Sequence, residues 1–108
     1  MRRIFKYQLS PFEGNIQTLS IPYLSDDAHE QKREANCWSI ATQIVNVAAQ
    51  DNIPTVWIMV DDEMPKRDVT FILVETGASC TGLEPYEHIG TALQFNGEYV
   101  THLFVKEG

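Results

Sequence analysis

Thr91 and His102, near the C-terminus, are the residues whose types and spacing best suit the binding of a polar ligand. An Asn-Gly pair at 96–97 separates two β-prone runs, 88–95 and 98–105. Such a pair favours a tight hairpin turn, because both turn positions need positive φ. Counting outward from the turn places Thr91 opposite His102. The two side chains either form a structural hydrogen bond, which we favour, or belong to a pocket in which His102 binds a polar ligand.

The same register places Gly90 opposite Leu103 on the other face of the hairpin. A glycine at this position leaves room for a neighbouring strand or for a ligand, and we favour the packing explanation. His88, at the start of the hairpin, joins His102 as a candidate ligand-binding histidine.

A Glu-Thr-Gly step at 75–77 ends the apolar run 69–74 and is a second candidate. The backbone N–H groups of such a turn can hold an anion, although an ordinary turn is the favoured explanation. Lys66 and Arg67 precede the same run, and we expect them to add positive charge at the same end of the sheet.

The remaining candidates for a functional site are aromatic and acidic residues. Trp57 is either a core residue, which we favour, or a platform for stacking a base. The acidic run 61–63 lies where adjacent side chains diverge, so it is better explained as solubilising charge than as a general acid and base. The sequence contains no Ser-His-Asp order, paired-carboxylate site or phosphate loop, so we predict no catalytic residue and no enzymatic activity. The candidate ligand-binding residues are Trp57, Lys66, Arg67, Glu75, Thr76, His88, Thr91 and His102.

No metal ion or other cofactor is predicted. The chain has three histidines and two cysteines, but their spacing matches no zinc-binding pattern. Cys37 and Cys80 lie far apart in the sequence, and in a reducing cytoplasm we expect two buried, reduced thiols.

The composition limits the partners of the protein. Its 108 residues suit a single domain, and fifteen acidic against eight basic residues give a net charge of −7. Such a surface repels phosphate backbones, so general nucleic-acid binding is disfavoured. No apolar run reaches the ~20 residues of a membrane helix, and Lys6 and Gln8 interrupt any signal-peptide core. We therefore expect no membrane association and a cytoplasmic location.

The N-terminal half is expected to hold two strands and a helical insertion. Residues 3–9 alternate in polarity, and residues 16–21 form a short strand that a proline ends. Capping-box spacing followed by helix formers predicts a short exposed helix within 25–36. Residues 37–50 fit either a continued helix or a strand, because apolar residues recur at both periods.

The remaining chain is expected to be a sheet. Residues 55–60 are apolar on both faces, which predicts a strand covered on both sides, and residues 69–74 are its expected central partner. The whole pattern predicts a mainly β (β-rich α+β) single domain over 1–108. It is a small antiparallel β-sandwich or partly closed barrel of six to seven strands, with one short helical insertion and a C-terminal hairpin.

Short segments over most of the chain share a recognisable pattern. They include IFKY at 4–7, IVNVAAQD at 44–51, VWIMVD at 56–61, ETG at 75–77 and IGT at 89–91. In these segments the chain resembles a family of small phage and prophage proteins of unassigned function. The resemblance favours a strand for 44–50, and it marks 23–42 as longer than expected.

This resemblance, together with the small size and acidity, implies a non-enzymatic phage protein that acts on a host factor in the host cytoplasm. We expect an anti-defence inhibitor that sequesters a nucleotide-derived immune signal between protomers of a homo-oligomer, or that masks a host defence protein. The alternatives are a virion accessory or structural protein and, less favoured, a small nucleotide hydrolase.

Overall fold

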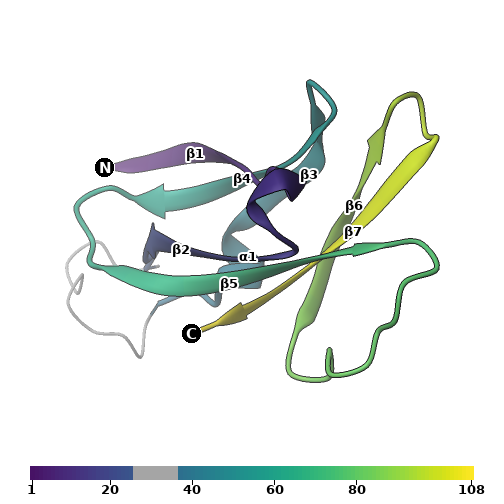
Figure 1. Cartoon of the computed structure of the whole chain (residues 1–108). Coiled ribbons are helices and arrows are strands. Elements are labelled where there is room, and N and C mark those ends of the chain that lie inside the picture. The colour runs from purple at the N-terminus through teal and green to yellow at the C-terminus, as the bar shows by residue number, and fades with distance from the viewer. Residues whose placement is uncertain (26–36) are drawn as a thin grey trace.

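Seven strands in two antiparallel sheets make up the described part of this computed structural model, residues 1–25 and 37–108 (Figure 1). One sheet has the strand order β1-β4-β3 and the other β2-β5-β7-β6. The elements are β1 (Arg2–Gln8), η1 (Pro11–Glu13), β2 (Ile16–Pro22), α1 (Ile40–Gln43), β3 (Ile44–Gln50), β4 (Ile53–Asp61), β5 (Lys66–Glu75), β6 (Glu87–Gln94) and β7 (Tyr99–Glu107). The predicted mainly β, antiparallel fold is confirmed, and the strands of the described residues do not close into a barrel.

The core lies between the two sheets. Ile58 of β4, Phe71 of β5 and Leu103 of β7 are completely buried and belong to one apolar cluster. On β4 the alternate residues Trp57 and Met59 remain partly exposed. The expectation that this strand is covered on both sides is therefore wrong for the face that carries Trp57, which is the outer face of its sheet.

β4 and β5 follow each other in the chain but do not pair, so the prediction that they are partners is wrong. β4 pairs with β1 and β3, whereas β5 pairs with β2 and β7. The backbone of Tyr23 hydrogen-bonds to both ends of the segment that connects β4 to β5. Its carbonyl accepts from the Asp61 N–H (3.1 Å), and its N–H donates to the Pro65 carbonyl (3.0 Å). Because both strands are apolar on their inner faces, placing them in opposite sheets packs those faces into one core.

The ambiguous stretch 37–50 contains both kinds of structure. Ser39 caps the four-residue helix α1 by accepting from the Thr42 N–H (3.4 Å). The chain then turns extended at Ile44, where a β-branched run begins β3. The strand predicted for 44–50 is confirmed, whereas the helix predicted within 25–36 lies outside the described residues.

The C-terminal hairpin has the predicted register from Gln94 to Gly90, and a bulge between Gly90 and His88 then shifts it so that His88 pairs with Phe104. Asn96 and Gly97 adopt φ of 58° and 86° in the turn, and Thr91 pairs with His102. A Cβ atom added to Gly90 would lie 2.7 Å from Cβ of Val47, so the missing side chain lets β3 pack closely against β6. The packing explanation for this glycine is confirmed.

The two cysteines differ from the prediction. No disulfide joins Cys37 to Cys80. Cys80 is exposed because it lies in the surface loop between β5 and β6, and Cys37 is partly exposed. The expected burial of both thiols is therefore wrong.

Candidate functional site

His102 lies at the centre of a hydrogen-bonded cluster on the outer face of the four-stranded sheet. Its Nε2 is 2.9 Å from Oγ1 of Thr76, which follows β5, and its Nδ1 is 3.1 Å from Oγ1 of Thr91 on β6. Each threonine hydroxyl can donate or accept, so both imidazole nitrogens are satisfied whichever tautomer is present. His102 therefore ties three chain segments together.

His88 is the more accessible histidine of this face. Its ring centroid is 6.3 Å from that of His102 and 5.1 Å from that of Phe104, and its side chain is exposed. Because both nitrogens of His102 already have threonine partners, His88 is the imidazole of this pair that is better placed to meet a ligand.

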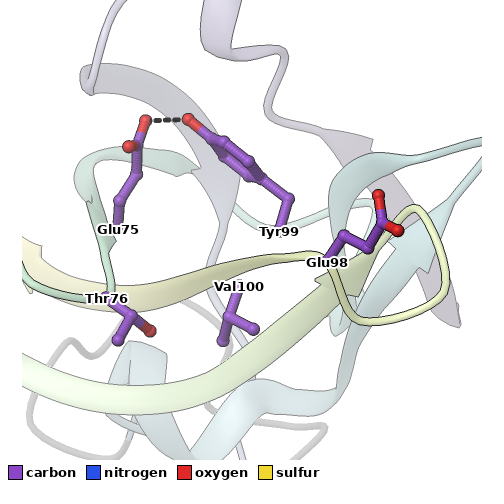
Figure 2. A pocket seen from close by; sticks show the side chains of 5 residues that line it. All are labelled: Glu75, Thr76, Glu98, Tyr99 and Val100. Atoms are coloured by element: carbon purple, nitrogen blue, oxygen red, sulfur yellow. Dashed lines mark hydrogen bonds between the residues drawn. The ribbon is translucent and has the colours of Figure 1, made fainter.

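A small hollow of about 350 Å³ opens at the adjoining end of the sheet, where β5 ends and β7 begins. Figure 2 shows Glu75, Glu98 and Tyr99 on one side of the strand pair, with Thr76 and Val100 on the other. The Tyr99 hydroxyl donates to Oε1 of Glu75. This hydrogen bond to a carboxylate raises the pKa of the Tyr99 phenol above its usual value, because ionising the phenol would remove the bond and place two anions together.

Two carboxylates and no lysine or arginine line this hollow. Glu75 and Glu98 both line the hollow, and both are exposed. We call Glu75, Glu98 and Tyr99 the acidic rim. Its chemistry suits an ammonium or guanidinium group, to which the carboxylates offer charge-assisted hydrogen bonds.

Lys66 and Arg67 do not lie at this end of the sheet. They begin β5, and Glu75 ends it nine residues later, which places them roughly 30 Å away at ~3.3 Å per residue. The expectation that they add positive charge beside the Glu-Thr-Gly step is wrong, because a strand carries its first and last residues to opposite ends of a sheet.

Arg67 is an internal link between elements. Its side chain is 6% exposed, its Nη2 donates to Oε1 of Gln43 (2.6 Å), and its Nε is 3.4 Å from Oε1 of Glu107. The guanidinium carbon lies 4.3 Å from the centre of the Tyr23 ring. Gln43 in turn donates to the carbonyls of Pro22 and Met59, one in each sheet. The guanidinium is thus held by Gln43, Glu107 and Tyr23 rather than presented at the surface.

Trp57 is also separate from the rim. It projects from β4 in the other sheet, where Lys6 of β1 is its cross-strand neighbour. Of the eight predicted site residues, the structure joins Thr76, Thr91 and His102 by hydrogen bonds on the outer face of the four-stranded sheet. His88 lies on the same face beside Phe104, near the start of β6, and Glu75 projects to the opposite face at the end of β5. Trp57, Lys66 and Arg67 lie elsewhere.

Two rim residues were not predicted from the sequence. Glu98 and Tyr99 follow the Asn-Gly turn, and Tyr99 meets Glu75 because β5 pairs with β7 in a register that places Glu75 opposite Thr101. That register is set by contacts far apart in the chain. No local spacing signals it.

The described residues contain no group of three or more histidine, cysteine, aspartate or glutamate side chains arranged to hold a metal ion. No helix among them is both long enough and apolar enough to cross a membrane.

The fold and the site define a small two-sheet β protein with an open, acidic candidate site at one end of its larger sheet. The chain belongs to the family described as a domain of unknown function, DUF7352, whose model matches residues 1–108. No curated protein and no solved structure gives a significant match to it.

Proposed function

We propose that this protein is a non-enzymatic binding protein that covers a basic surface of another protein with its acidic rim. The observation that carries the proposal is the hollow at the end of β5, which is lined by the carboxylates of Glu75 and Glu98 and by no lysine or arginine. Opposite charge across an interface speeds encounter and selects the partner, even where it adds little affinity.

A basic protein surface suits the rim better than a nucleotide does. A phosphate placed beside Glu75 and Glu98 would face carboxylates, and the arginine expected to neutralise it is buried elsewhere. Of the two routes that the sequence left open, masking a protein is therefore the one we propose, and sequestering a nucleotide-derived signal becomes an outcome of the test.

The proposed setting is the cytoplasm of an infected bacterium, where the protein would inhibit a host defence protein. The support for this setting is the resemblance of the chain to small phage and prophage proteins, its short length and its acidity. The same setting accommodates a homo-oligomer, since a small β protein with open sheet edges can assemble through them.

A plaquing assay tests the proposal. The protein is expressed in hosts that carry individual defence systems, and the plaquing efficiency of a sensitive phage is measured. We expect rescue in at least one host, loss of rescue with the double variant Glu75→Gln/Glu98→Gln, and full rescue with the matched control Glu13→Gln/Glu63→Gln. The control changes the same number of charges at exposed positions outside the rim.

Three results would contradict the proposal: rescue that survives loss of both rim carboxylates, calorimetric binding of cyclic or ADP-ribose-type nucleotides to the purified protein, or stoichiometric copies in purified phage particles. The second would favour sequestration, and the third a virion protein.

A further inference from the structure

A second, larger hollow adjoins the acidic rim. It encloses about 560 Å³ between the β5–β6 loop and the end of β5. Its apolar lining comes from Ile16 and Ile72 on paired strands, from Val74 and from Leu83 and Tyr86 of the loop. Ile16 is 65% exposed, so apolar surface is open to a partner here.

This hollow runs along a part of β5 that β2 does not cover. The ladder between β2 and β5 ends at the pair Ile16 and Ile72. The Leu73 N–H still donates to the Asn15 carbonyl (2.8 Å), and the Glu75 carbonyl accepts from the Ala78 N–H (3.0 Å) in the turn that follows, but no residue of β2 pairs with Val74 or Glu75. An uncovered strand edge beside an apolar hollow is the arrangement that accepts an extended peptide as an added strand.

Glu75 lines both hollows. Resting on the proposed function, we infer that the two hollows form one recognition surface for an extended segment of the partner, in which a large apolar residue is directly followed or preceded by a basic one. The apolar side chain enters the larger hollow, and the basic side chain meets Glu75.

The strand geometry sets this spacing. Val74 shares the outer face of the sheet with Ile72, and Glu75 projects to the opposite face, as successive residues of a strand do. Side chains directly opposite each other on paired strands share a face. An added strand therefore places its apolar residue opposite Val74 and its basic residue opposite Glu75, which are neighbours in sequence.

Three synthetic peptides with blocked termini test the inference by calorimetry with the full chain. They are Gly-Thr-Phe-Arg-Thr-Gly, its same-composition isomer Gly-Phe-Thr-Arg-Thr-Gly, and Gly-Thr-Phe-Gln-Thr-Gly. We expect the first to bind most tightly. The second peptide should bind more weakly, because its Phe and Arg side chains then point to the same face of the added strand. The third should bind more weakly because its Gln lacks the positive charge of Arg.

Protein variants locate the binding. Glu75→Gln should lower the affinity for the first peptide roughly tenfold, because one charge-assisted hydrogen bond of ~1.5 kcal/mol is lost. Ala78→Trp, at an exposed position that lines the larger hollow, should weaken it through occupation of the hollow. Glu13→Gln should bind as the wild type does. In the unmodified protein, the amide NMR signals of Ile16, Leu83 and Tyr86 should shift during the titration.

Equal binding of the two Phe-Arg isomers, or unchanged signals for Ile16, Leu83 and Tyr86, would overturn the inference, as would wild-type affinity in a folded Ala78→Trp variant. These failures differ from failure of the proposed function. Rescue of plaquing that depends on Glu75 and Glu98 but not on Ala78 would leave the masking role standing without the peptide groove.

Discussion

Two adjacent basic residues, Lys66 and Arg67, have different roles because one is exposed and the other is enclosed. Arg67 contacts Gln43, Glu107 and Tyr23, and through Gln43 it is linked to backbone carbonyls in both sheets. Removing the Arg67 side chain leaves the buried Oε1 of Gln43 without its donor, whereas Glu107, whose side chain is 50% exposed, can be hydrated. An unsatisfied buried acceptor costs more than the loss of a surface ion pair.

We therefore predict that Arg67→Ala lowers the free energy of unfolding by about 2 kcal/mol. The neighbouring change Lys66→Ala should alter it by less than about 0.5 kcal/mol, because Lys66 is exposed. Urea unfolding followed by tryptophan fluorescence measures both values. Similar values for the two variants would show that the Arg67 network contributes little to stability.

At the scale of elements, the packing of β3 against β6 depends on Gly90. The Val47 side chain occupies the space that a side chain at Gly90 would need, and the contact brings edge strands of the two sheets together. Interiors packed this closely do not absorb an added methyl group without a shift of the neighbouring side chain or backbone.

Gly90→Ala should accordingly destabilise the protein by about 1–3 kcal/mol. The same change should cost less in a Val47→Gly background, because all the Val47 side-chain atoms near the new Cβ atom are then absent. A double-mutant cycle by urea unfolding measures the difference. Additive effects would mean that β3 and β6 adjust without strain.

The elements divide into those that local sequence predicts and those that it does not. The hairpin at 96–97 was predicted with its register as far as Gly90 because its turn chemistry is local, whereas the bulge before Gly90 was not predicted. The assignment of β4 and β5 to different sheets was not predicted, because both strands are similarly apolar. The residue that hydrogen-bonds to their connection, Tyr23, lies far away in the chain. The same limit applies to the rim, where the hairpin placed Thr91 beside His102 but not Tyr99 beside Glu75.

For the molecule as a whole, acid stability depends on the carboxylates where β4 leaves the first sheet. The Glu63 N–H and then the Met1 amino group donate to Asp61 and lower the pKa of its carboxyl. Hydrogen bonds from the Arg3 side chain and then the Met1 amino group lower the pKa of Asp62. A carboxyl whose pKa is lowered by folding binds protons more readily in the unfolded chain, so falling pH favours unfolding.

The stability that these two groups contribute is thus fully present above the unfolded-state pKa of about 4, and it is lost as the pH falls through their lower folded-state pKa values. We predict that the urea midpoint of the wild type is level from about pH 5 to 7 and falls below about pH 4. The double variant Asp61→Asn/Asp62→Asn should have a lower urea midpoint than the wild type from about pH 5 to 7, and its midpoint should fall less steeply below about pH 4. The matched Glu13→Gln variant should follow the wild type, because its carboxylate is exposed in the η1 turn. If the urea midpoint of the double variant fell with pH as steeply as that of the wild type, the acid sensitivity would come from other carboxylates.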